Sequence, residues 1–289
     1  RASQRQMWLL LLPSLVPVVV FSVYPLLNGI WLGFTDAKAG YNVQFRFNGL
    51  DNYTKLLHDD LFWNSFKIGL IWAFSVTILQ FLLALGLAML LSAGLRFQWL
   101  VRPLALVPWA MPSVIVAILW KLVYNPDAGI LNAALKSLHI ISTNINWLGD
   151  FSLALPAVIV VGVWAGMPQT TIALLAGLQN TPDELHEAAK LDGASAWQVF
   201  RHVTLPLVWP FILAAAVIRG IDALKAFDTI FVISNGGPGT ASETLNILLY
   251  LQAFSFYDMG YASAVVVVFF ALVLLITLLM LWTRRQATL

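Results

Sequence analysis

Six long apolar segments limit what this chain of 289 residues can fold into. They lie at about 7–34, 67–93, 103–124, 152–178, 206–233 and 260–283. Each is long enough for a helix that crosses a hydrocarbon core, which takes roughly 20 residues. The share of hydrophobic residues is 60% and the share of charged residues is 10%, far from the values of soluble domains. The sequence therefore predicts an all-α polytopic membrane protein with six transmembrane helices.

Positively charged residues near the ends of these segments predict the orientation of the chain. Four pairs fall on one side, namely Arg1 and Arg5, Arg96 and Arg102, Lys190 and Arg201, and Arg284 and Arg285. The other side carries Lys38, Arg46, Lys55 and Lys136 in longer loops. Because cytoplasmic loops carry an excess of Lys and Arg, we expect both termini to be cytoplasmic.

The segments also suggest how the chain is organised. We expect an N-terminal part, residues 1–62, with the first transmembrane helix and the first extracytoplasmic loop. Residues 63–289 would form a core domain with five transmembrane helices. In the second extracytoplasmic loop, apolar residues recur at helical spacing over 130–138, which predicts a short amphipathic helix on the outer surface.

Composition and motifs argue against nucleic-acid binding and against enzyme chemistry. The net charge is +2, and the Lys and Arg residues are scattered rather than gathered into a basic stripe. The chain has no cysteine, which excludes thiolate zinc and cysteine-ligated clusters. His186 and Glu187 begin like a zinc-protease motif, but Lys190 stands where the second histidine must be. We expect neither an enzyme nor a cofactor bound by this chain.

A mostly polar segment, residues 180–206, separates the fourth and fifth apolar segments. Thr181 as N-cap, Pro182 at the first helical position and Glu184 completing a capping box predict a helix from Pro182 to about Leu191. This helix would carry acidic residues at the positive end of its dipole.

The second half of the same segment predicts a bend and another helix. Gly193 fits the end of the first helix. Ala194 to Val203 can form a second short helix, and Leu205-Pro206 should then turn the chain into the fifth segment, because proline disfavours helix at the residue before it.

The spacing of residues in this segment carries a family resemblance. Glu187-Ala188-Ala189 is followed after three residues by Gly193, and after nine more by Val203, one residue and Leu205-Pro206. This pattern resembles the cytoplasmic coupling loop of the membrane subunits of binding-protein-dependent ABC importers, although Val203 stands where that family usually has Ile. The resemblance implies the type I ABC importer permease fold.

In that family the loop docks into a groove on a separate ATPase subunit. The small side chains of Ala188 and Ala189 would let another protein surface approach the backbone closely, and Glu187 adds a charge that a partner could hold. No Gly-x-x-x-x-Gly-Lys-Ser/Thr sequence occurs in the chain, so ATP and Mg are expected on the partner. The residues mapped onto the coupling surface are Glu187, Ala188, Ala189, Leu191, Asp192 and Gly193.

The resemblance also implies an assembly in the inner membrane of a prokaryote. It would contain two ATP-binding subunits, an extracytoplasmic solute-binding protein and a second permease subunit. In carbohydrate members the second permease is usually a homologous but different chain, and a second copy of this chain is the alternative. The chain would be surrounded by membrane lipid.

A second signature lies just after the fifth apolar segment. Residues 235–240, Asn-Gly-Gly-Pro-Gly-Thr, are followed by Glu243-Thr244. Gly-Gly-Pro alone is only a turn, but here it resembles the segment found in the carbohydrate branch of importer permeases, close to subunits related to maltose and glycerol-phosphate permeases. This implies uptake of a sugar, a di- or oligosaccharide. Glycerol-phosphate or another small solute is the alternative, and a self-contained secondary transporter is a further one.

The fifth apolar segment contains four charged residues, Arg219, Asp222, Lys225 and Asp228, spaced three apart and alternating in sign. A charge at the bilayer centre costs about 2.5 kcal/mol or more, so these side chains should face the helix bundle, a partner or water. They predict either a polar seam between subunits or the lining of a translocation path. Sugars combine hydrogen bonding with stacking on aromatic rings, and further candidates for such a lining are Trp120, Tyr124, Trp164 and Gln169.

Overall fold

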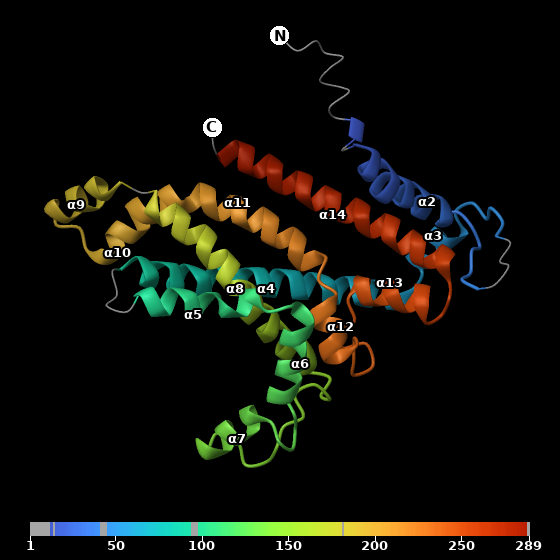
Figure 1. The fold of residues 1–289 in the computed structure, drawn as a ribbon, viewed down its shortest axis with the longest axis horizontal. Helices are drawn as coiled ribbons and strands as arrows, with labels where there is room; N and C mark the ends of the chain where they lie inside the picture. Colours follow the sequence, from blue (N-terminus) through green and yellow to red (C-terminus); the bar gives the residue numbers. More distant parts are fainter. Residues whose placement is uncertain (1–11, 14, 41–44, 94–97, 181, 288–289) are drawn as a thin grey trace, which may run out of the picture. The chain divides into compact units, whose positions relative to one another are not determined.

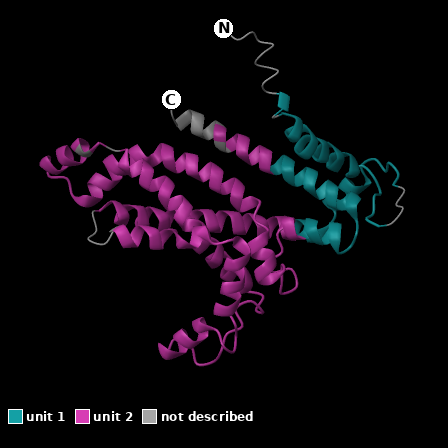
Figure 2. Ribbon diagram, in the orientation of Figure 1, with its two compact units in different colours: residues 1–63, 248–272 teal, residues 64–247, 273–289 magenta. Residues whose placement is uncertain are grey.

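The computed structural model describes residues 12–13, 15–40, 45–93, 98–180 and 182–287. The chain divides into two compact units (Figure 2). Unit 1 comprises residues 1–63 and 248–272, and unit 2 comprises residues 64–247 and 273–289.

The prediction of an all-α protein is confirmed for the described residues. They contain no strand, and only an isolated bridge joins Thr35 to Phe47. The π-helical segments are η1 (Val19–Val23) and η2 (Phe200–Thr204). The α-helices are α2 (Tyr24–Leu32), α3 (Asp51–Leu57), α4 (Asp60–Ser92), α5 (Gln98–Ala110), α6 (Ser113–Val123), α7 (Ile130–Ser137), α8 (Ala154–Gln179), α9 (Asp183–Leu191), α10 (Ala196–Val199), α11 (Leu205–Leu224), α12 (Asp228–Ser234), α13 (Leu245–Phe254) and α14 (Met259–Ala287).

Five helical stretches in the described residues are long and apolar enough to cross a membrane. They are Leu15–Leu32, Asp60–Ser92, Ala154–Gln179, Ala196–Leu224 and Met259–Leu279. A sixth is obtained if the bent pair Trp99–Ala110 and Ser113–Val123 is counted as one span. The expected amphipathic helix at 130–138 is also present, as α7.

The third predicted span, 103–124, is not one straight helix. α5 and α6 meet at an angle of 98°, and Pro112, between them, has an extended backbone with φ −56° and ψ 139°. Proline disfavours helical geometry at the residue before it and supplies no N–H. Residues 111 and 112 therefore end α5, and the chain changes direction before α6 begins.

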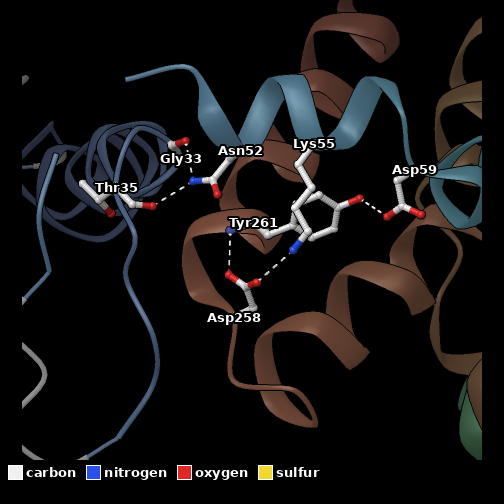
Figure 3. Close-up of polar contacts among 7 residues, drawn as sticks. All are labelled: Gly33, Thr35, Asn52, Lys55, Asp59, Asp258 and Tyr261. Carbon is white, nitrogen blue, oxygen red and sulfur yellow. Dashed lines mark hydrogen bonds and ion pairs between the residues drawn. The ribbon is translucent and has the colours of Figure 1, made fainter. Parts of the chain in front are cut away.

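Unit 1 is held together by polar contacts among α3, the start of α14 and the chain that follows α2 (Figure 3). Asn52 is buried and donates through Nδ2 to the carbonyl oxygens of Gly33 (3.1 Å) and Thr35 (2.8 Å). Lys55 pairs with Asp258 at 3.3 Å, and its Nζ lies 4.4 Å from the ring centroid of Tyr261. The Tyr261 hydroxyl donates to Asp59. These bonds fix the loop after α2 to two helices.

Unit 2 is built around α8, which packs against α5 and α11. α8 and α11 run from the α9–α10 region toward α6 and α12 (Figure 1). Part of the core consists of small and aliphatic side chains, Ala84, Ala88, Leu174 and Val208, each at most 1% exposed. Alanines at such positions let helix backbones approach closely, as is common between helices in membranes.

Two prolines follow π-helical segments rather than ending a helix. η1 precedes Pro25, and Tyr24 N–H bonds to Val19 O; η2 precedes Pro206, and Leu205 N–H bonds to Phe200 O. The wider π turn accommodates the missing N–H and the ring of the following proline. The expectation that Leu205-Pro206 turns the chain is therefore wrong, because residues Ala196–Leu224 form one continuous span.

The fifth predicted span, 206–233, is also wrong at its C-terminal end. α11 stops at Leu224, and α12 begins a separate helix at Asp228. Side chains of α4 and α13 donate hydrogen bonds to carbonyl oxygens at the end of α11 and just after it. Trp72 Nε1 donates to Ala223 O at 3.0 Å, and Asn246 Nδ2 donates to Leu224 O and Ala226 O at 2.9 and 3.1 Å. Helix ends leave such carbonyls unpaired unless a side chain or water binds them.

The Gly-Gly-Pro segment forms a tight loop after α12. Asn235, Gly236 and Gly239 all have positive φ angles, of 51°, 83° and 54°. The hydroxyl of the buried Ser242 donates to Gly237 O at 2.7 Å, which closes the loop on itself. This backbone shape suits glycine, which adopts positive φ without steric cost.

Candidate functional site

The segment between α8 and α11 ends its first helix in a Schellman motif. Gly193 has φ +77°; its N–H bonds to Lys190 O and the N–H of Ala194 bonds to Ala189 O, both at 3.0 Å. These are the two hydrogen bonds that define the motif, in which glycine takes the left-handed position. The expected helix end at Gly193 is confirmed.

The next helix begins with a capping box. Ser195 Oγ accepts from the backbone N–H of Gln198 at 3.4 Å, and Gln198 Oε1 accepts from Ser195 N–H at 2.7 Å. The first helix, α9, begins at Asp183 after Pro182, one residue later than predicted. The expected N-cap, Thr181, lies outside the described residues.

We call α9, α10 and the residues between them the α9–α10 loop. It lies at one end of unit 2 (Figure 1). Its side chains are mostly exposed, and Leu191 is 89% exposed although it is apolar. One side-chain contact ties it to the helix that follows, because His186 Nε2 lies 3.1 Å from Thr204 Oγ1. Of the residues mapped onto the coupling surface, only Ala189 is half-buried; Glu187, Ala188, Leu191, Asp192 and Gly193 are exposed.

A cavity of about 350 Å³ opens in unit 2 between α5, α6, α8 and the end of α11. Its volume is within the range of sites for small molecules, about 300–1,000 Å³. Three tryptophan or phenylalanine rings line it, from Trp72, Trp109 and Phe227. The predicted lining residues that it brings together are Gln169, Arg219, Asp222, Lys225 and Asp228.

Arg219 is held in this cavity by a residue that the sequence analysis did not single out, Gln80. Arg219 Nε donates to Gln80 Oε1 at 2.5 Å, and Gln80 Nε2 donates to Gly162 O at 2.7 Å. Gln80 is 0% exposed, and buried polar groups need such partners to offset lost hydration. An uncharged amide within the apolar segment 67–93 was the available signal, because polar residues inside spans are costly.

The other charged groups of the cavity are closer to solvent. Lys225 Nζ and Asp222 Oδ1 lie 3.4 Å apart, with side chains 59% and 38% exposed. Asp228 accepts a hydrogen bond from Ser113 Oγ at 3.1 Å. The expectation that all four charged residues lie along one helix is wrong, because Asp228 starts the separate helix α12. The charged row on α11 runs only from Arg219 to Lys225, the C-cap of that helix.

The three aromatic candidates form a cluster of their own. Trp120 lies 5.3 Å from Tyr124 and 5.7 Å from Trp164, measured between ring centroids. Tyr124 is buried and its hydroxyl donates to Ala157 O at 2.9 Å. None of the three is among the described residues that line the 350 Å³ cavity. Their packing joins α6 to α8.

Within the described residues, no group of three or more His, Cys, Asp or Glu side chains is arranged to hold a metal ion. The cavity instead offers amide, guanidinium, ammonium, carboxylate and hydroxyl groups beside aromatic rings. Such a lining can bind an uncharged polar molecule by hydrogen bonds and stacking.

The sequence from residue 80 to residue 287 matches the family described as "Binding-protein-dependent transport system inner membrane component". The chain belongs to this family. It is the membrane-embedded permease subunit of an ABC importer and not an enzyme, since the ATPase of these systems is a separate subunit.

Curated relatives of this permease include several sugar-transport proteins. It is 36% identical over 281 residues to the trehalose/maltose transport system permease protein MalF of Thermococcus litoralis, covering 96% of this chain and 93% of the relative. It is 33% identical to the sulfoquinovosyl glycerol transport system permease protein SmoG of Agrobacterium fabrum, covering 93% and 87%. It is 32% identical to the diacetylchitobiose uptake system permease protein NgcF of Streptomyces coelicolor, covering 93% and 80%.

The solved structures agree on the fold of this permease. A chain of a bacterial ABC transporter involved in the import of alginate superposes with a TM-score of 0.84 at 22% identity, covering 97% of this chain and 95% of the other. A chain of a bacterial alginate ABC transporter in complex with alginate pentasaccharide-bound periplasmic protein also gives 0.84 at 22% identity, covering 98% and 94%. The expected type I ABC importer permease fold is confirmed.

Proposed function

We propose that this permease moves a neutral di- or oligosaccharide across the inner membrane into the cytoplasm. The observation that carries the proposal is the cavity around Arg219. Its lining holds two cationic groups, Arg219 and Lys225, and two anionic groups, Asp222 and Asp228, beside aromatic rings. The formal charges cancel, and such a lining suits many hydroxyl groups and apolar sugar faces better than a phosphate.

The names of the relatives support the same class of solute. MalF of Thermococcus litoralis is named for trehalose and maltose, and NgcF of Streptomyces coelicolor for diacetylchitobiose. Glycerol-phosphate uptake would need an excess of positive charge around the solute. In the cavity, Asp222 and Asp228 offset that charge.

The α9–α10 loop is the proposed coupling surface. Its exposed residues would dock on a separate ATPase, which binds ATP and Mg and drives the two states of the permease. Two such ATPase subunits, a second and homologous permease chain, and an extracytoplasmic solute-binding protein complete the proposed complex. In this arrangement both termini and the α9–α10 loop are cytoplasmic.

The proposal is tested by purifying the complex through a tag on this chain in mild detergent and identifying its subunits by mass spectrometry. ATPase activity is then measured with binding protein loaded with maltose, trehalose, diacetylchitobiose or glycerol-3-phosphate. We expect an ATPase and a second permease to co-purify, with activity stimulated by a loaded sugar. Stimulation by glycerol-3-phosphate alone would contradict the proposed solute. Transport by the lone chain in liposomes without ATP would replace the proposal with secondary transport.

A further inference from the structure

Two side chains of α4 each connect α8 to α11 in unit 2. Trp72 covers the position of Gly162 on α8 and donates to Ala223 O on α11. Gln80, eight residues further along α4, donates to Gly162 O and accepts from Arg219. Trp72 binds a backbone atom of α11, whereas Gln80 binds the charged end of a side chain. Only the contact of Gln80 can therefore orient a charged side chain, that of Arg219.

Arg219 lines two cavities. A smaller cavity of about 90 Å³ shares three lining residues with the 350 Å³ cavity, namely Gln169, Arg219 and Asp222. Its other lining residues lie nearer the C-terminal end of α8 and the N-terminal end of α11, in the direction of the α9–α10 loop. We call the three shared residues the neck.

The contacts of Gln80 fix the guanidinium without cancelling its charge. A carboxylate at this position would neutralise Arg219, but an amide oxygen only accepts one of its hydrogen bonds. Nε donates to Gln80, and a guanidinium carries its other N–H donors on the two Nη groups, which can bind a further acceptor. Gly166 makes the room, because a Cβ atom there would lie 2.8 Å from Arg219 Nη2 and 3.0 Å from its Cζ.

We infer that Gln80 is a positioning residue that fixes the Arg219 guanidinium at the neck, where Arg219 donates hydrogen bonds to oxygen atoms of the passing solute. This inference rests on the proposed function for the identity of the solute. Arg219 would then discriminate among solutes by the oxygens they present, and Gln80 would act only through it.

The first experiment is a double-mutant cycle in proteoliposomes that contain the complete complex, with binding protein loaded with maltose. Gln80→Met keeps nearly the side-chain volume of glutamine but removes its hydrogen bonds to Arg219 and to Gly162. We expect it to lower maltose uptake roughly ten- to hundredfold, the cost of a lost hydrogen bond to a charged group. In an Arg219→Lys background the same change should lower maltose uptake by less than about twofold, because that variant has no guanidinium for Gln80 to position.

A matched control is Thr171→Val, which removes a polar group from a side chain of α8 that is 1% exposed. Thr171 Oγ1 bonds to Met167 O within α8 and does not line either cavity. We expect its uptake to stay near that of the unchanged complex. An equal loss from Gln80→Met in both backgrounds would show a merely structural role and overturn the inference.

The second experiment needs no sugar. Because the chain has no cysteine, Gln169→Cys places its single thiol at the neck. We compare labelling by an anionic and by a cationic methanethiosulfonate reagent, and expect the anionic-to-cationic ratio to be higher with a positioned Arg219 than without one. Gln80→Met should lower that ratio by roughly two- to threefold, because the guanidinium keeps its charge but is no longer held beside the thiol.

An unchanged labelling ratio would overturn the positioning role, whatever the solute. If the ratio falls but the unchanged complex takes up no sugar, the proposed solute is wrong and the positioning of Arg219 stands. The two failures are therefore separable.

Discussion

The α9–α10 loop and the neck belong to the same unit, but they satisfy their polar groups in opposite ways. The loop closes its helix ends with its own backbone and with Ser195, and it leaves Glu187 and Leu191 exposed. At the neck, Arg219 depends on Gln80, which is 0% exposed and links three helices. The loop leaves side chains exposed at the surface where we propose that the ATPase docks, whereas the neck holds its polar groups by contacts within the chain.

The largest effect is expected at the loop. Gly193→Arg should abolish sugar uptake and co-purification of the ATPase while membrane insertion stays intact. Nothing lies within 4 Å of a Cβ atom built on Gly193, so this chain leaves room for the start of a side chain there, and a long cationic one would obstruct the proposed docking of the ATPase. Non-glycine residues also resist this backbone geometry by about 1–2 kcal/mol. Glu187→Lys should act in the same direction by reversing a charge at that surface.

Gly49→Arg is the matched control for this prediction. Gly49 has φ +66°, and nothing lies within 4 Å of its Cβ position. It carries the same backbone strain, but it falls in a loop predicted to be extracytoplasmic, away from the ATPase. Retention of the ATPase by Gly49→Arg and its loss in Gly193→Arg, measured by pull-down, would support the comparison. Normal pull-down and uptake in Gly193→Arg would contradict it.

The next largest effect is expected at the neck. Gly166→Ala should lower uptake by roughly tenfold, in the range for a disturbed hydrogen bond to a charged group, because the added methyl group would displace Gln80 and Arg219. The ATPase should still co-purify, since the loop is untouched. Gly86→Ala on α4 serves as the control, because its Cβ position has open space. Failure of the ATPase to co-purify with Gly166→Ala would show that the neck and the α9–α10 loop do not act separately.

A smaller effect is expected for Leu191→Ser. The side chain is 89% exposed in this chain, so the thermal unfolding midpoint of the isolated permease should not change. Burial of a leucine against a partner is worth about 1.5–3 kcal/mol, and only part of that would be lost here. We expect the affinity for the ATPase, measured by titration in detergent, to fall about three- to tenfold. An unchanged affinity would remove Leu191 from the docking surface.

The smallest effect is expected for Thr204→Val. It removes the hydroxyl that lies 3.1 Å from His186 Nε2, a contact worth about 0.5–1.5 kcal/mol. We expect uptake to change by less than about twofold. A complete loss of uptake would show that the loop is also held from within, and the contrast between the two regions would disappear.

The same contrast explains what the sequence could and could not predict. The first helix of the loop is specified by neighbours along the chain, so Pro182 and Gly193 were enough to predict that helix and its end. The expected turn at Pro206 was wrong, because the second helix continues into the span that follows it. The charges of the neck were found because Arg219 and Asp222 are costly in an apolar segment. Gln80 and Gly166 matter only through their contacts with Arg219, and helices distant in sequence meet in ways that local patterns do not encode.

The end of α11 shows the same limit. Residues 225–233 are apolar enough to continue the helix, but Trp72 and Asn246 bind its last carbonyl groups. Those partners come from α4 and α13, so the segment itself does not show them; its local signal for the break is Asp228 in the first turn of α12. The bend between α5 and α6 also has a local signal in the sequence, namely Pro112.

The π-helical segment before Pro206 sets the rotational phase between the α9–α10 loop and the span that follows it. Segment η2 carries one residue more than an α-helical turn would need. Deleting one residue there would rotate everything before it by about 100° around the helix axis and shift it by about 1.5 Å. Every residue of the loop would be kept, but its exposed face would point elsewhere. If the ATPase docks on the loop as proposed, the direction in which it would move this span therefore depends on the number of residues in η2.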